Sequence, residues 1–399
     1  MVRTLPGALF VFGALGACGF SVPTGSTPPI DASEIDDAPD AMIGTSGNVC
    51  YGTLVHVCFT SAPTGTVLPL SPLNTGNDAA CTLIYAQSDG VEVCVIAADT
   101  IMVTGDLTAT GPRPLVLVAA TRITVSGMVD VSSTGMPSRR GAGSQGLACT
   151  NSSAGTNDRG GGGGGGGGTF STRGGTGGIG DTNSNGPPAG TAPGGPSGLD
   201  QATPVTLRGG CRGAVGGEGG NSDGVNPGGP GGLGGGAVAL VSGGAITVAG
   251  AVYASGSGGG TIAGQPGTGN CVPGNGGFEQ GGGGGGSGGM VVLDAPALAV
   301  PGKIAANGGG GGGGGACLGG ARGGDGTTAQ WNMQASGGMG DVAAGGANGG
   351  SGSSRIAFTL LDGFSDISGG GGGGGGLGYV WTKGTLAGGA MISPAPVSQ

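Results

Sequence analysis

Charged side chains, aromatic side chains and histidine are all scarce in this sequence. Charged residues make up 9% of the 399 residues, aromatic residues make up 4%, and His56 is the single histidine. A soluble domain normally carries about 25% charged residues. A Ser-His-Asp triad could form only around His56, and nothing near it marks a nucleophile. We therefore expect a protein that is not an enzyme and that holds no metal and no cofactor.

Basic residues are outnumbered, and long apolar runs are rare. The chain has 13 Lys and Arg against 22 Asp and Glu, a net charge of -9. Nucleic-acid binding requires the opposite sign, so no nucleic acid is expected as a partner. Beyond the N-terminal segment, no stretch approaches the roughly 18 apolar residues of a transmembrane helix.

The N-terminal segment has the pattern of an export signal. Arg3 is followed by an apolar run from Leu5 to Ala17, which ends in Leu15-Gly16-Ala17-Cys18. This ending resembles the lipobox of bacterial lipoproteins. The resemblance implies a signal peptide over 1–17, a lipid on Cys18 that anchors the chain to a membrane and, with Gly19 after the cysteine, a surface-exposed outer-membrane location. An ordinary secretory signal with a later cleavage site is the alternative.

Residues 18–47 form an acidic, proline-rich stretch behind the lipobox. Five acids fall within ten residues, and the stretch offers little apolar surface to bury. Such segments stay disordered. We expect a flexible tether that separates the folded part from the membrane.

The cysteine count favours disulfides. Nine cysteines less Cys18 leave eight, an even number, and an exported chain meets an oxidising compartment. Proximity in the sequence suggests four pairs: Cys50–Cys58, Cys81–Cys94, Cys149–Cys211 and Cys271–Cys317. A zinc cluster would need C-x-x-C pairs or several histidines. The first pair and half of the second lie in residues 48–90, which we expect to form an N-terminal cap.

The remainder, 91–399, contains an internal repeat. Four copies align without gaps, beginning at Val93, Leu115, Val238 and Met290, and each predicts three short strands. The first strand is continuously apolar, and the other two alternate apolar and polar residues. We predict an all-β fold, a parallel β-helix in which Ile101, Ile123, Ile246 and Leu298 form one interior column. An antiparallel β-sandwich is the alternative.

Smaller features accompany the repeat. A glycine marks the same bend in every copy, where a tight turn with positive φ is expected. These glycines are Gly105, Gly127, Gly250 and Gly302. Weaker copies are expected over Leu68–Leu73 and Ile356–Ile367.

Glycine makes up 109 residues and concentrates in four insertions. The insertions span 132–237, 255–289, 307–355 and 369–377, leave from one corner of the coil, and each contains a pure glycine run. Two interpretations remain open. The runs are disordered loops, since ordered glycine loses the most backbone entropy. Alternatively they are extended strands that bond to one another in a polyglycine-II-like slab, an interpretation that the low charge favours.

Phrases such as Ala245–Val252 and Lys303–Gly309, with the lipobox, resemble glycine-rich β-helical surface proteins of Gram-negative bacteria, adhesins among them. The resemblance implies a structural or adhesive envelope component with glycan or other cell-surface partners.

The alternative function is a polysaccharide-binding or polysaccharide-cleaving β-helix. Cleavage needs paired carboxylates on an outer face. The outward positions of the third strands are Thr108, Asp130, Tyr253 and Ala305, and those of the second are Met102, Thr124, Thr247 and Ala299. Only one of these is a carboxylate, although Asp294 and Asp362 could meet near a corner. The candidate sugar-stacking aromatics are Trp331, Trp381, Tyr253 and Tyr379.

Overall fold

The computed structural model describes most of the chain beyond the tether. The described residues are 48–144, 149, 152–182, 190–199, 202–221, 224–261, 279–315, 320–326, 333–341, 347–353, 362–364, 366, 368–387 and 389–398. They all belong to one compact unit. Their regular structure is β-strand apart from one short 3-10 helix, η1 (Asp78–Ala80), which confirms the all-β class. The predicted signal peptide, the lipidated Cys18 and the tether lie outside the described residues.

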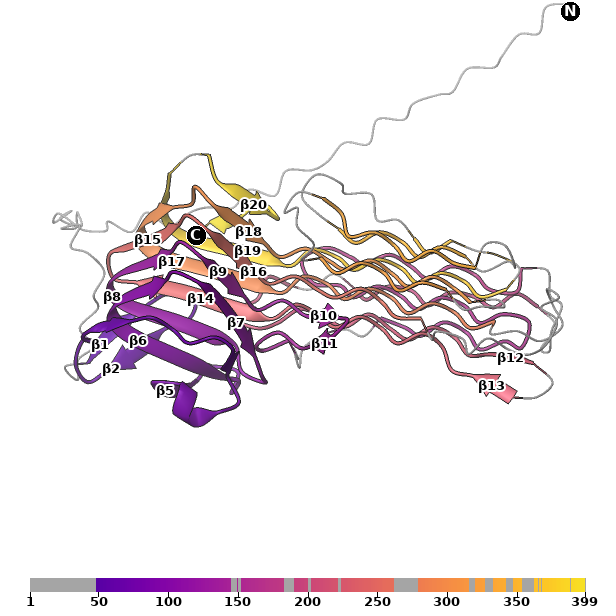
Figure 1. The fold of residues 1–399 in the computed structure, drawn as a ribbon, viewed down its shortest axis with the longest axis horizontal. Helices are drawn as coiled ribbons and strands as arrows, with labels where there is room; N and C mark the ends of the chain where they lie inside the picture. The colour runs from indigo at the N-terminus through magenta and orange to yellow at the C-terminus, as the bar shows by residue number, and fades with distance from the viewer. Residues whose placement is uncertain are drawn as a thin grey trace, which may run out of the picture. The chain divides into compact units, whose positions relative to one another are not determined.

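Two mainly parallel sheets hold most of the strands (Figure 1). The larger has the order β21-β19-β17-β14-β8-β6-β3, with β15 and β5 beside this path, and the smaller has the order β20-β18-β16-β9-β7-β4. The strands of the larger sheet are β3 (Thr66–Val67), β5 (Leu83–Ala86), β6 (Glu92–Val103), β8 (Leu115–Val125), β14 (Ala237–Ser242), β15 (Ala245–Val248), β17 (Met290–Ala299), β19 (Tyr379–Leu386) and β21 (Val397–Ser398). Those of the smaller sheet are β4 (Leu73–Asn74), β7 (Asp106–Thr110), β9 (Met128–Asp130), β16 (Ala251–Tyr253), β18 (Lys303–Ala305) and β20 (Met391–Ser393).

Three antiparallel hairpins complete the regular structure. They are β1 (Val49–Tyr51) with β2 (Val57–Phe59), β10 (Thr134–Gly135) with β11 (Ser138–Arg139), and β12 (Gly219–Asn221) with β13 (Gly224–Asn226).

Successive copies of the repeat lie over one another. Ile101 pairs with Ile123, Ile123 with Ile246, and Ile246 with Leu298, which is the predicted column. In two of the three pairings between neighbouring copies, the first strands are displaced by one residue from the gap-free alignment, whereas Val238 pairs with Leu115 as aligned. Leu115 pairs with Cys94 instead of Val93, because the pairing of β6 with β8 shifts register between Ala98 and Thr100.

A further copy closes the stack where the sequence analysis did not place it. β19 pairs with β17, and β20 pairs with β18, so the fifth copy occupies 379–393. The copy expected over Ile356–Ile367 lies largely outside the described residues. Its described parts bond to glycine-rich segments instead, as when Gly363 donates to the carbonyl of Thr176. The insertions 307–355 and 369–377 therefore both fall between β18 and β19.

Two apolar clusters explain the hydrophobic patterns. One fills the space between the two sheets and includes the Ile101 column. The other covers the opposite face of the larger sheet, where the β1–β2 hairpin, Phe170 and Leu207 pack on residues such as Val116 and Val292. The first strand of each copy is buried on both faces, and this is why it is apolar without alternation.

The predicted cap, 48–90, divides into two parts. The β1–β2 hairpin lies on the outer face of the larger sheet. Residues 66–86 supply the terminal strands: β3 and β5 pair with β6, and β4 pairs with β7. The expected copy over Leu68–Leu73 is present only at its flanks, and Leu68 and Leu70 between them are exposed.

Candidate functional site

The corner where the chain leaves each copy carries a buried ladder of polar side chains. Ser132, Ser255 and Asn307 follow β9, β16 and β18 at equivalent places, and all three are buried. The Ser255 amide donates to Ser132 Oγ at 2.9 Å, and the Asn307 amide donates to Ser255 Oγ at 3.1 Å. Ser393 Oγ donates to Asn307 Oδ1 at 2.6 Å. The ladder joins the strands to the glycine-rich segments and fixes where those segments begin.

A glycine recurs in each copy at the bend between the second and third strands, and the reason differs from the one predicted. None of Gly105, Gly127, Gly250 and Gly302 has a positive φ, so that prediction was wrong. The last three are needed because the copies approach closely: a Cβ on Gly127 would lie 2.2 Å from the carbonyl oxygen of Gly105. A Cβ on Gly250 would lie 1.8 Å from the carbonyl oxygen of Gly127. Gly105, which has no earlier copy beside it, would meet nothing within 4 Å.

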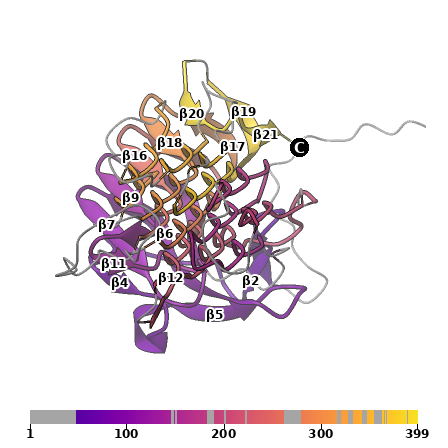
Figure 2. The ribbon, with the colours of Figure 1, turned by 90° about the vertical axis from the view of Figure 1, so that its right-hand side faces the viewer.

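The four pure glycine runs are ordered, buried and bonded through their backbones. The amide of Gly165 donates to the carbonyl of Gly282, and the amide of Gly373 donates to that of Gly165, both at 2.9 Å. The run at 160–168 bonds in this way to six segments: 152–158, 174–180, 192–198, 209–218, 279–289 and 368–378. The runs at 281–286, 308–315 and 369–376 likewise bond through their backbones to several neighbouring segments. Figures 1 and 2 show these segments running side by side beyond the sheets.

This environment explains why the four runs contain no other residue. A Cβ on Gly164 would lie 1.9 Å from the carbonyl oxygen of Gly371, and one on Gly166 would lie 2.2 Å from that of Pro196. Every direction out of an inner run meets a neighbouring backbone, so no side chain fits. We call the inner runs and the segments around them the glycine bundle.

The segments around the inner runs follow a triplet pattern that the sequence analysis missed. Thr176 and Ile179 are exposed, whereas Gly175 and Gly178, which directly precede them, are buried. The same spacing of three exposes Arg212, Val215 and Glu218 in another outer segment. An extended helix with three residues per turn presents every third residue to one side. The G-G-x triplets in 174–179 are the sequence signal from which this period of three could have been predicted.

Three of the four expected disulfides are present: Cys50–Cys58, Cys81–Cys94 and Cys149–Cys211. Cys149–Cys211 ties together two parts of the first insertion that are 62 residues apart in sequence. Cys271 and Cys317 lie outside the described residues.

The carboxylates considered for polysaccharide cleavage are not brought together. Asp294 Oδ2 accepts from the amide of Thr53 at 2.6 Å, beside the β1–β2 hairpin. Asp362 Oδ1 accepts from the amide of Thr176 at 2.9 Å, in the glycine bundle. Asp130, the carboxylate of the outward ladders, is buried and forms an ion pair with Arg139.

The aromatic candidates do not form an exposed platform in the described part of the chain. Trp381 and Tyr379 are buried on the outer face of the larger sheet, and Tyr379 packs edge-on against Phe170 with ring centroids 4.9 Å apart. Tyr253 is half-buried, and burial raises the pKa of its hydroxyl. Trp331 lies outside the described residues.

An unforeseen cation–π contact joins two parts of the first insertion, beside the edge-on contact of Phe170 with Tyr379 of β19. The Arg208 guanidinium lies 4.7 Å from the centre of the Phe170 ring. Burial lowers the pKa of Arg208. Next to Arg208, the Leu207 backbone forms two hydrogen bonds with the side-chain amide of Gln87. Gln87 Nε2 donates to the Leu207 carbonyl, and the Leu207 amide donates to Gln87 Oε1. The cluster locks the glycine-rich insertion onto the strands.

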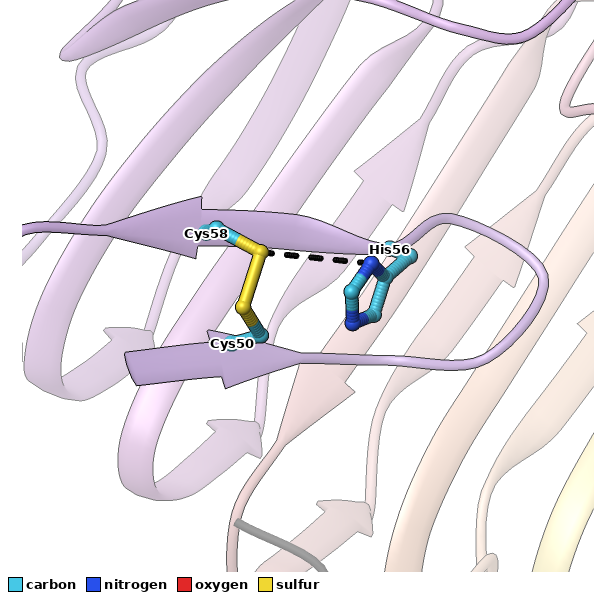
Figure 3. A group of neighbouring side chains, drawn as sticks. All are labelled: Cys50, His56 and Cys58. Atoms are coloured by element: carbon cyan, nitrogen blue, oxygen red, sulfur yellow. Dashed lines mark hydrogen bonds between the residues drawn. A yellow bond between two sulfur atoms is a disulfide. The ribbon is translucent and has the colours of Figure 1, made fainter. Parts of the chain in front are cut away.

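His56 lies beside a disulfide on the β1–β2 hairpin (Figure 3). Its Nδ1 is 3.9 Å from Cys58 Sγ, and the ligand atoms of Cys50, His56 and Cys58 all lie within 4.8 Å of one another. Cys50 and Cys58 occupy directly opposite positions across the hairpin. Both sulfurs are committed to the disulfide, so in this state the three residues are not a set of metal ligands.

Comparisons with known proteins give no relative. No family model, no curated protein and no solved structure matches the chain. In the part of the chain that the structure describes, we find no helix with the length and hydropathy needed to cross a membrane.

Proposed function

We propose that the protein is a non-enzymatic envelope lipoprotein, a parallel β-helix that carries a polyglycine-II bundle as a stiff structural or adhesive element. The glycine bundle carries this proposal. Nearly all backbone amides of the four inner runs donate to carbonyls of neighbouring segments. A regular array of this kind, continuous with the strands, is suited to a structural role. Its inner runs consist of glycine and therefore carry no reactive side chains.

The β-helix interpretation is supported by register. Equivalent residues of consecutive copies pair in parallel in both sheets, as in Leu107–Val129 and Val129–Val252. An antiparallel sandwich would instead pair neighbouring copies in opposite directions. The only antiparallel partner of a large-sheet strand among the described residues is β5, in the terminal copy.

The polyglycine-II interpretation is supported by spacing. Along run 160–168, amides three residues apart donate to one neighbour: Gly162, Gly165 and Gly168 donate to Glu279, Gly282 and Gly285. A period of three is that of an extended helix of the polyproline-II type. Such segments can bond on all sides because no Cβ separates them.

The envelope location rests on the sequence around Cys18. Labelling with a radioactive fatty acid should mark the wild-type protein and leave Cys18→Ser unlabelled. Equal labelling of both would reject the lipid anchor. Protease shaving of intact cells then tests surface exposure.

The structural or adhesive role is tested by binding. A soluble fragment beginning at Asn48 is screened against whole cells and a glycan array, beside a variant whose glycine-rich insertions are replaced by short loops. We expect any binding to disappear with the insertions. Binding that survives their removal would contradict the role of the bundle, and release of shortened glycans by the fragment would favour the polysaccharide-cleaving alternative.

A further inference from the structure

The β1–β2 hairpin sorts its side chains onto two faces. Tyr51, Val55 and Val57 are buried against the larger sheet. Successive residues of a strand point to opposite faces, so Cys50, His56 and Cys58 share the face turned away from the sheet (Figure 3). His56 directly precedes β2 and is two residues from Cys58, and Cys50 on β1 is the direct partner of Cys58.

This face gathers two sulfurs and one imidazole. The three ligand atoms lie within 4.8 Å of one another, and His56 is exposed to solvent. A tetrahedral zinc ion holds sulfur at about 2.3 Å and imidazole nitrogen at about 2.0–2.1 Å, so small side-chain movements would bring all three atoms onto one ion. The disulfide is what prevents this.

We propose that the hairpin is a redox-gated zinc site. A dithiol reductant transfers two electrons to the Cys50–Cys58 bond and becomes a disulfide itself, and the two sulfurs are released as thiols. One Zn²⁺ then displaces two protons and binds both thiolates and the His56 imidazole. The fourth position faces solvent and takes a water molecule. A disulfide oxidant then takes up the two electrons and two protons, becomes a dithiol, and re-forms the Cys50–Cys58 bond, which releases the ion.

The hairpin is held in place by contacts that reduction leaves intact. Tyr51, Val55 and Val57 remain packed on the sheet, and the amide of Thr53 donates to Asp294 Oδ2 at 2.6 Å. A preorganised scaffold therefore survives the loss of the covalent bond. Two thiolates and an imidazole favour zinc over the oxygen-seeking cations calcium and magnesium.

The experiment titrates the full-length chain with Co²⁺, a spectroscopic substitute for Zn²⁺, before and after reduction by a dithiol that is then removed under nitrogen. The matched control is the double variant Cys50→Ser/Cys58→Ser, which keeps every other cysteine and so reports any ion bound by the remaining thiols. We expect the reduced wild type to bind one more Co²⁺ per chain than this control, with thiolate-to-cobalt charge-transfer and tetrahedral ligand-field bands. The oxidised proteins should not differ.

A second variant tests the imidazole. His56→Ala should weaken Co²⁺ and Zn²⁺ binding by about tenfold or more and alter the ligand-field bands, since even an outer partner of a metal ligand is worth that much. Equal binding by reduced wild type and the double variant would overturn the proposal. So would an unchanged affinity in His56→Ala, or loss of the strand signal in circular dichroism when the wild type is reduced.

Discussion

Ser255 Oγ accepts a hydrogen bond from the buried amide of Asn307 at 3.1 Å, across 52 residues of sequence. In turn the Ser255 amide donates to Ser132 Oγ in the preceding copy. This polar ladder satisfies backbone groups at the point where parallel strands end and glycine-rich segments begin. The ladder and the glycine bundle thus form a single hydrogen-bonded system, and each can be tested separately.

Ser255→Ala should lower the free energy of unfolding by about 1–3 kcal/mol, because it removes the buried Oγ that accepts from the Asn307 amide. Thr247→Ala, at a half-buried outward position on the neighbouring strand, is the control and should change stability by about 0.5 kcal/mol or less. Urea denaturation measures both. Equal effects would mean that the ladder does not stabilise the corner.

Gly250→Ala tests whether close stacking of the copies is the reason for the glycine at the bend between the second and third strands. A Cβ at Gly250 would lie 1.8 Å from the Gly127 carbonyl oxygen, so a copy must move, at a cost of about 1–3 kcal/mol. Gly105→Ala is a matched control, because it occupies the same bend with nothing within 4 Å. Thermal unfolding should show a lower Tm for Gly250→Ala alone. A similar loss in Gly105→Ala would refute stacking.

The repeat and the possibility of a bonded glycine slab could be read from the sequence, but the choice between slab and disordered loops, and the partner of each glycine run, could not. Alternating residues such as Ile123-Thr124-Val125 report which face of a strand is buried, so the Ile101 column followed from local pattern. The register between the first strands β6 and β8 could not be predicted in this way, because it depends on an irregularity after Ala98. A run of identical glycines carries no information about which neighbour it bonds to. The position of the fifth copy was not predicted, because Gly384, at φ 117°, interrupts the alternation of apolar and polar residues in β19.

Gly165→Ala should disrupt the glycine bundle. Its Cβ would lie 2.4 Å from the carbonyl oxygen of Ala214, which is backbone and cannot turn aside. We expect a loss of about 3 kcal/mol or more and faster exchange of the glycine amides around it. The control is Thr176→Ala, at an exposed position of an adjoining segment. Hydrogen exchange followed by mass spectrometry distinguishes the two, and unchanged protection in Gly165→Ala would be incompatible with an inner run closed on all sides.

Asp158→Asn should change how stability depends on pH. Asp158 is buried where run 160–168 begins, and its Oδ1 accepts from the Gly160 amide at 2.8 Å. Burial raises the pKa of this carboxyl above its ordinary 3.8, with a further contribution from the Asp181 carboxyl. The folded state therefore holds the proton more tightly than the unfolded state does. The resulting stability is fully present below about pH 3.8 and is lost as the pH rises through the raised pKa of the folded state.

The asparagine variant keeps an oxygen acceptor for Gly160 and never becomes charged. Its free energy of unfolding should equal that of the wild type in acid and exceed it at neutral pH. The decline in stability as the pH rises should therefore be smaller in the variant. Urea midpoints measured from pH 3 to pH 8 make the comparison, with Asp99→Asn as a control for the loss of one negative charge. If the wild type and Asp158→Asn give parallel curves over this range, the buried Asp158 carboxyl does not hold its proton in the folded bundle.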